Sequence, residues 1–166
     1  MPNILLRASS IGNIMAYPEK DTLADGAKTY LEKIASQHIL DWKENLDTFE
    51  MQKGKDCEDI SIDLYNLNQD TFYMKNTARI SNDLMTGECD ILDQEKSLVI
   101  DIKTAYSKKT FPMFLTASKL YEWQLRCYMH LYNVDNAELA YCLVSTPEHL
   151  IKRGEPEDWH IVDHIE

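Results

Sequence analysis

Apolar residues follow two different spacings along this chain, and the spacing changes at about residue 71. In the first part they recur every three or four residues, which places them on one face of a helix. We predict a short helix within residues 7–15, helical structure over 23–49 as one helix or two, and a helix over 55–67 that begins after Gly54. Charged residues fill most other positions of the middle stretch, as expected of a solvated helix face.

Beyond residue 71 the spacing becomes that of strands. Three short strands of an antiparallel meander are expected at 77–81, 87–92 and 98–103. A helix over 118–132 follows, and the continuously apolar stretch 139–144 predicts a strand covered on both faces. This order predicts an α/β fold in which helices flank a small mixed sheet, made of the meander and the buried strand.

All 166 residues are expected to form one domain, which is long enough to bury a hydrophobic core. Its parts are N-terminal helices over about 8–50, a core over about 53–146 and a polar C-terminal tail over 147–166. The N-terminus lacks the apolar run of a signal peptide, and no stretch reaches membrane-spanning length. We therefore expect a cytoplasmic protein without a membrane partner.

The net charge and the spacing of the cysteines limit which partners and which metal sites the sequence favours. Seventeen basic and 28 acidic residues give a net charge of −11, which disfavours a general nucleic-acid binder. A local basic cleft or bound divalent ions can still reverse the field where it matters. The four cysteines are scattered without a C-x-x-C pair, which predicts neither a zinc ribbon nor a disulfide framework. We expect small buried hydrophobes at Cys57, Cys89, Cys127 and Cys142.

Charged residues interrupt the two most apolar strands of the expected meander. Asp101 and Lys103 project from the same face of the last strand, because side chains alternate along a strand. Asp90 lies in the strand before it, and Glu58 lies at the edge of the apolar stripe of the helix 55–67. Burying such groups is costly unless they are paired or bind a metal, so their position indicates a functional site.

A metal site follows if Glu58, Asp90 and Asp101 converge. Carboxylate oxygens, together with the backbone carbonyl of Ile102, are the ligands that Mg²⁺ or Mn²⁺ prefers. Such ions activate water and stabilise the attacking and leaving oxygens in phosphodiester cleavage. Lys103 would point into the same cavity, where it could orient the water, help to deprotonate it or neutralise charge on the phosphate. The alternative for Glu58 is a glutamate at the edge of the core whose carboxylate is solvated.

Several of these residues occur in a fixed order: Glu58, then Gly87-x-x-Asp90, then Asp101-x-Lys103, then Gln124 on the following helix. This ordered set resembles the PD-(D/E)xK nuclease superfamily. Within it, the sequence is most similar to the lambda-exonuclease and YqaJ-type viral recombinase group, related to RecB-type nucleases, over about residues 7–147. The resemblance implies a restriction-endonuclease-like core, metal ligation by the three carboxylates, a catalytic lysine at 103 and a supporting role for Gln124.

The resemblance also implies an activity and its partners. Members of the group use Mg²⁺, degrade duplex DNA from an end in phage-type recombination, and commonly form ring-like oligomers alongside a single-strand annealing protein. The segment Arg7-Ala8-Ser9-Ser10 resembles the one that binds the 5′-phosphate, so Arg7 and Ser9 are implied as DNA contacts. Some RecB-type relatives hold an iron–sulfur cluster through grouped late cysteines, a grouping that this sequence lacks, and no such cluster is expected.

Two further interpretations stay open at the level of the sequence. The same metal chemistry serves a structure- or sequence-specific endonuclease, and a non-catalytic protein on a nuclease fold could recruit a basic partner through its acidic surface. The basic residues considered for contact with DNA phosphates are Lys108, Lys109, Lys119 and Arg126. Each could equally be a solvated surface charge, since surface lysines are common.

Overall fold

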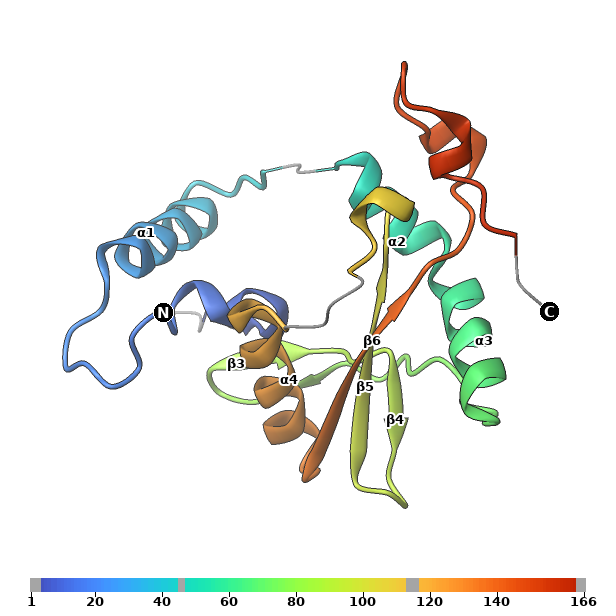
Figure 1. Ribbon diagram of the computed structural model, residues 1–166. Helices are drawn as coiled ribbons and strands as arrows, with labels where there is room; N and C mark the ends of the chain where they lie inside the picture. The colour runs from blue at the N-terminus through green and yellow to red at the C-terminus, as the bar shows by residue number, and fades with distance from the viewer. Residues whose placement is uncertain (1–3, 45–46, 113–116, 164–166) are drawn as a thin grey trace.

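The computed structural model describes residues 4–44, 47–112 and 117–163, and it confirms the predicted α/β fold (Figure 1). In chain order the elements are β1 (Leu6–Arg7), η1 (Ala8–Asn13), α1 (Asp25–Ile39), α2 (Phe49–Asp56), α3 (Glu58–Gln69), β2 (Ile80–Ser81), β3 (Met85–Gly87), β4 (Ile91–Asp93), β5 (Leu98–Thr104), η2 (Lys108–Thr110), α4 (Lys119–Tyr132), β6 (Asn136–Cys142), η3 (Glu148–Leu150) and η4 (Glu157–Trp159). No helix within the described ranges is long and apolar enough to cross a membrane.

Two small mixed sheets take the place of the single sheet that the sequence predicted. In the first sheet β3 lies in the middle, parallel to β1 and antiparallel to β2. In the second sheet β5 lies in the middle, antiparallel to β4 and parallel to β6. The prediction of one continuous meander is therefore wrong, although the β2–β3 and β4–β5 pairs are antiparallel as expected.

The break between the two sheets falls inside the predicted strand 87–92. Between β3 and β4 the chain bonds to Asn76 and not to a neighbouring strand. Asn76 N donates to Asp90 O at 2.7 Å, and the side-chain amide of Asn76 donates to Cys89 O at 2.9 Å. The sequence pattern could not reveal this crossing, because each half of the stretch keeps a strand-like pattern.

Strand β5 divides the core, with α4 on one side and α3 on the other (Figure 1). Val99 packs with Tyr128 of α4, whereas Ile100 and Ile102 pack against α3. The alternation of side chains along this strand predicted the division correctly. Asp101 projects to the same side as Val99, so its carboxylate faces α4. The four cysteines are all buried and free, as expected.

The stretch predicted as one helix or two contains α1 and the start of α2, and the bounds of α2 correct the prediction for Gly54. The hydroxyl of Thr48 accepts from Met51 N at 3.3 Å and caps α2 at its beginning. Gly54 lies within α2 and does not interrupt it. The break falls at Cys57, which ends α2 and directly precedes Glu58, the first residue of α3.

Lys53 anchors α2 to the chain just beyond β5 and β6. Its side chain is fully buried, and its ammonium donates to Tyr106 O at 3.0 Å, Val144 O at 2.7 Å and Thr146 Oγ1 at 2.9 Å. Three acceptors satisfy the three protons, while burial lowers the pKa of Lys53 to about 8. The bonds of Lys53 hold the last turn of α2, which contains Gly54, against the sheet. They thereby determine where α3 begins.

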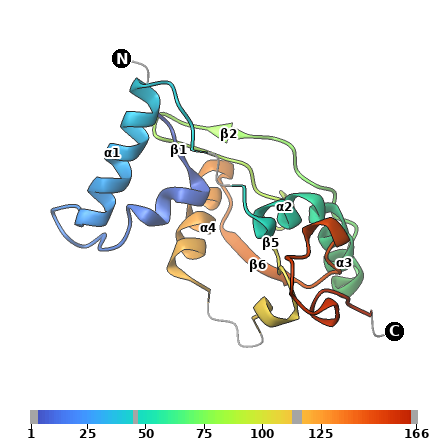
Figure 2. The same ribbon diagram turned by 90° about the horizontal axis from the view of Figure 1, so that it is seen from above.

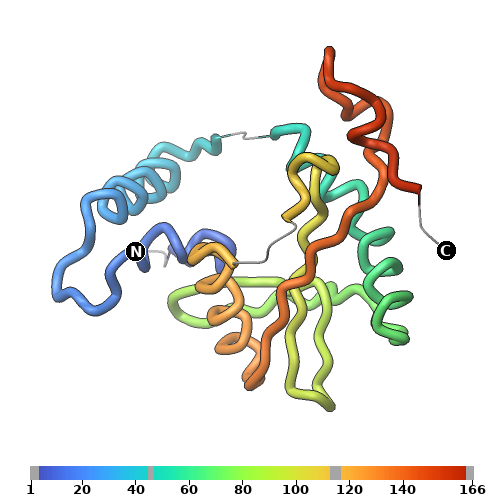
Figure 3. The backbone as a smooth tube through the Cα atoms, viewed as in Figure 1, coloured from blue at the N-terminus to red at the C-terminus, as the bar shows by residue number. Residues whose placement is uncertain are grey.

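The polar stretch after residue 146 folds back beside α2 and carries η3 and η4 (Figure 2; Figure 3). The backbone N–H of Thr146 donates to His160 O at 2.9 Å. The buried ring of His160 packs edge-on against Tyr106 at 5.0 Å between ring centres. The described part of the expected polar tail therefore packs on the body of the fold.

Replacing Gly12 by alanine is expected to destabilise the fold. Gly12 lies in η1 against the start of α4, and a Cβ there would lie 2.8 Å from the Cα of Leu120. Because a backbone atom cannot rotate away, we expect a loss of about 1–3 kcal/mol in the free energy of unfolding, measured by urea titration. Gly26→Ala in α1 is the matched control, since its Cβ would meet no described atom within 4 Å. Equal losses in the two variants would contradict this packing.

Candidate active site

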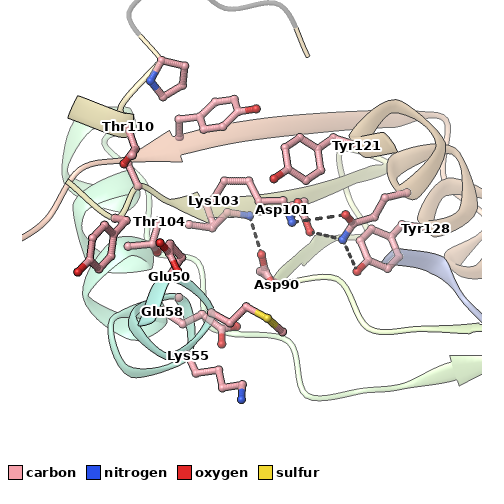
Figure 4. Close-up of a pocket in the computed structure, with 18 of the residues that line it drawn as sticks. Glu50, Lys55, Glu58, Asp90, Asp101, Lys103, Thr104, Thr110, Tyr121 and Tyr128 are labelled. Atoms are coloured by element: carbon pink, nitrogen blue, oxygen red, sulfur yellow. Dashed lines mark hydrogen bonds and ion pairs between the residues drawn. The ribbon is translucent and has the colours of Figure 1, made fainter. Parts of the chain in front are cut away.

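A pocket of about 640 Å³ lies beside β5, between α4 and the α2–α3 pair (Figure 4). Its lining includes every residue that the sequence predicted as catalytic or metal-binding. These are Glu58, Asp90, Asp101, Ile102, Lys103 and Gln124. They come from α3, from the crossing before β4, from β5 and from α4, so the fold brings together side chains that lie far apart in the sequence.

Asp90 reaches the pocket from the crossing between β3 and β4. Its Oδ2 accepts the backbone N–H of Ile102 at 2.6 Å, which holds the carboxylate against β5. That N–H can bond a side chain because the paired register of β4 and β5 stops at Ile91 and Ile100. The crossing that the sequence did not predict is therefore what positions Asp90.

Gln124 holds the buried carboxylate of Asp101 from the side of α4. Its Nε2 donates to Asp101 Oδ1 at 3.0 Å and to the Tyr128 hydroxyl at 2.9 Å. Its Oε1 accepts from Lys103 Nζ at 3.4 Å. Gln124 and Tyr128 lie four residues apart on one face of α4, so both reach the pocket. The supporting role that the resemblance implied for Gln124 thus corresponds to a direct contact with Asp101.

The ammonium of Lys103 lies between an anion and an aromatic ring. Its Nζ is 2.7 Å from Asp101 Oδ2 and 4.8 Å from the centre of the Tyr121 ring. Tyr121 was missed at the level of the sequence. Its position three residues before Gln124 and seven before Tyr128 places it on the same face of α4, and this spacing was the signal that could have found it.

Burial raises the pKa values of both aspartates. Burial raises the pKa of Asp90 to about 7, with the nearby charges of Asp101 and Glu58 adding to it and the hydrogen bond from Ile102 N opposing it. Burial also raises the pKa of Asp101, and the charge of Lys103 opposes that rise. Both carboxylates are thus less stable as anions than in water, and a bound cation would relieve this.

The residues of the pocket fit an ion that prefers oxygen ligands, such as Mg²⁺ or Mn²⁺. Among the described residues, the buried Asp101 Oδ2 has a single polar contact, the ammonium of Lys103 at 2.7 Å. Glu58 is engaged by Lys75, whose ammonium lies 3.0 Å from Glu58 Oε2 and 3.4 Å from Asp59 Oδ1. As they stand, no three acidic, histidine or cysteine side chains among the described residues form a closed metal-ligand cluster. Glu58 would therefore have to exchange Lys75 for the cation.

A second, smaller pocket of about 110 Å³ shares Arg7 and Tyr128 with the first. Ser9 lines it as well, so the two residues predicted to contact a phosphate lie together. Arg79 lines the same pocket, and its guanidinium pairs with Glu88 at 3.1 Å. No pattern in the sequence indicated Arg79, because only the fold brings this residue to the N-terminal segment.

The other basic candidates divide into two groups. Lys108 and Lys109 are exposed on η2, the short helix that ends at Thr110 on the wall of the larger pocket. Lys119 and Arg126 are not part of the lining of either pocket, and Arg126 pairs with its helix neighbour Glu122 at 2.7 Å. The structure thus places the first pair near the candidate site and leaves the second pair on the outer surface of α4.

Comparisons with known proteins agree with this fold. No protein-family model matches the sequence, and no curated protein shows significant similarity to it. Among solved structures, a phage-related exonuclease from Haemophilus somnus 129PT superposes with a TM-score of 0.89 at 28% identity, over 96% of this chain and 77% of that one. The alkaline exonuclease LHK-Exo from Laribacter hongkongensis superposes with a TM-score of 0.64 at 14% identity, over 88% of this chain and 73% of that one. The structure of LHK-Exo in complex with dAMP superposes with a TM-score of 0.61, at the same identity and over the same shares of the two chains. The chain therefore has the fold of these exonucleases.

The raised pKa of Asp90 predicts that the metal-free protein loses stability as the pH rises from about 4 to 7. An unfolded aspartate releases its proton near pH 3.8, whereas the folded Asp90 keeps its proton up to about pH 7, so the unfolded state is increasingly favoured across that interval. In EDTA at pH 8 we expect the free energy of unfolding of Asp90→Asn to be about 1–3 kcal/mol higher than that of the native protein. Below about pH 4 the two free energies should become equal.

Denaturant titrations of both proteins between pH 3.5 and 8 measure this difference. Asp83→Asn serves as the control, because Asp83 is exposed and outside both pockets. A native stability that stays level or rises with pH relative to Asp90→Asn would show that Asp90 is not a strained carboxylate.

Proposed function

We propose that this protein is a metal-dependent deoxyribonuclease that hydrolyses phosphodiester bonds, acting as an exonuclease at the ends of duplex DNA in phage-type recombination. The observation that carries the proposal is that three carboxylates and Lys103 line one pocket. The structural neighbours support it, since they are a phage-related exonuclease and an alkaline exonuclease.

Glu58, Asp90 and Asp101 would hold Mg²⁺ or Mn²⁺, with the backbone carbonyl of Ile102 as a further ligand. A divalent ion bound there supplies an activated water and neutralises charge on the phosphate. Gln124 orients Asp101 through its 3.0 Å hydrogen bond, and the 2.6 Å bond from the backbone N–H of Ile102 orients Asp90. These bonds preorganise the carboxylates, so that little reorganisation is needed during the reaction.

Lys103 is the charged group best placed to act on the reacting atoms. Its ammonium lies in the same pocket, 2.7 Å from Asp101 Oδ2, and once that carboxylate binds a cation the ammonium can turn to the scissile phosphate. There it aligns the attacking water and neutralises the charge that develops on the phosphate oxygens. The ring of Tyr121 limits the positions that the ammonium can take.

The smaller pocket suits a terminal phosphate. Arg7 and Arg79 offer guanidinium groups and Ser9 offers a hydroxyl, which are the donors that phosphate oxygens accept well. Because Arg7 and Tyr128 line both pockets, a strand end held in the smaller pocket leads into the larger one. This connection favours an exonuclease over an endonuclease. Lys108 and Lys109 on η2 are proposed as further phosphate contacts.

The partners of this activity are proposals as well. The exposed apolar side chains of Ile39 and Leu40 at the end of α1 suit contact with another chain, as a homo-oligomer would provide. A single-strand annealing protein is the partner that the proposed recombination role requires. A non-catalytic binding protein is disfavoured, because an inactive fold would have no reason to keep a buried and a half-buried aspartate whose pKa values are both raised.

Digestion of three duplexes with Mg²⁺ tests the proposed mode of action. We expect progressive shortening of a linear duplex with 5′-phosphates, slower digestion of the same duplex with 5′-hydroxyls, and no cleavage of a closed circle. Arg7→Ala should reduce the advantage of the phosphorylated end. Cutting of the closed circle would instead support the endonuclease.

Two substitutions test the proposed catalytic roles. Asp101→Asn should lower cleavage by more than about a hundredfold, because a neutral amide oxygen binds a divalent cation much more weakly than a carboxylate does. Lys103→Met should lower kcat by a similar factor and leave Mn²⁺ affinity within about threefold, because its role is in the transition state. Lys119→Met on the outer surface of α4 is the control. Cleavage at the native rate by Asp101→Asn would refute the metal-dependent mechanism.

A further inference from the structure

Gly54 lies inside α2 although glycine is less stable than alanine in the interior of a helix. Close packing is the usual reason for such a glycine, and it explains Gly12 and Gly87, where a Cβ would come within 3.0 Å of neighbouring atoms. At Gly54 a Cβ would meet no described atom within 4 Å. Contacts among the described residues therefore do not require a glycine here.

The open space in front of Gly54 is the larger pocket. The residues of α2 that line this pocket are Glu50, Met51, Gly54 and Lys55, a spacing that forms one face of the helix. Glu58 lies one turn beyond Gly54 and lines the same pocket. Gly54 is thus bare backbone on the pocket wall, in line with a proposed metal ligand.

The surroundings of this wall suit a polyanion. Lys55 is exposed beside Gly54 and pairs with Asp47 at 3.1 Å, a surface ion pair that a phosphate can replace at little cost. Lys108 and Lys109 are exposed on η2, the helix that ends at the pocket residue Thr110. Cations are therefore present along the pocket on the side of α2 and on that of η2.

We propose that the DNA strand leaves the carboxylates along α2, with its sugar–phosphate backbone against the bare backbone of Gly54. This inference rests on the proposed nuclease function and adds the path of the substrate. A glycine permits the close approach, because any side chain would occupy the space that the strand needs. Gly54 is then a binding residue for the strand next to the scissile phosphate, without a part in the chemical step.

The experiment compares native protein with Gly54→Ala and Gly54→Met, using Gly26→Ala as the matched control. Gly26 also lies in a helix with no described atom within 4 Å of its Cβ, but it lines neither pocket. Alanine and methionine are both good helix formers, so the series changes side-chain size without breaking the helix. Thermal unfolding, Mn²⁺ affinity by titration calorimetry, and kcat and KM on a linear 5′-phosphorylated duplex are measured for all four proteins.

We expect Gly54→Ala to raise the Tm by about 1–4 °C, since it replaces glycine inside a helix, and Gly26→Ala, in the first turn of α1, to raise it by less. Gly54→Ala should raise the KM for DNA by about tenfold and Gly54→Met by more, with Mn²⁺ affinity unchanged. Gly26→Ala should keep native kcat and KM.

The possible failures are distinguishable. Native protein that cleaves DNA, together with Gly54 variants of native KM, overturns this inference and leaves the proposed function intact. A lower Tm or weaker Mn²⁺ binding in Gly54→Ala also overturns it, because the glycine would then serve packing or the metal site. Native protein that neither binds nor cleaves DNA overturns the proposed function and this inference together.

Discussion

The arrangement of this molecule depends on one costly feature, the carboxylate of Asp101 buried in the central strand of a sheet. Gln124 bonds one of its oxygens, and Lys103 pairs with the other. Asp90 lies in the same pocket and bonds the backbone of the next residue of β5. Burial raises the pKa values of both aspartates, so the fold holds them where their charge is least stable. A bound cation would relieve this strain, and this is the physical reason to propose that the pocket is an active site.

A second constraint sets the remaining wall of the pocket. The buried ammonium of Lys53 bonds carbonyls just beyond β5 and β6, and this fixes the last turn of α2 against the sheet. α3 begins at Glu58 directly after α2, so the same anchor determines where Glu58 stands relative to Asp101. The position of Gly54 on the pocket face of α2 follows from this anchor as well.

The sequence predicted which residues line the larger pocket better than it predicted the connections of the strands. Alternation along β5 correctly assigned Asp101 to one face and Ile100 to the other, because burial on both sides leaves a strong pattern. The crossing between β3 and β4 was missed, since it depends on Asn76, a residue distant in sequence and unremarkable by itself. Lys53 and Arg79 were missed for a related reason. Their partners are distant in sequence or brought near only by the fold. Without the fold, a basic residue is expected to be a solvated surface charge.

The most direct test of this account is the position of Mn²⁺ in crystals of the protein, located by its anomalous scattering. We predict a peak within coordination distance of Asp90 and Asp101, with the Glu58 carboxylate turned away from Lys75 and toward the ion. Full occupancy of Mn²⁺ elsewhere, with the contact between Glu58 and Lys75 unchanged, would contradict it.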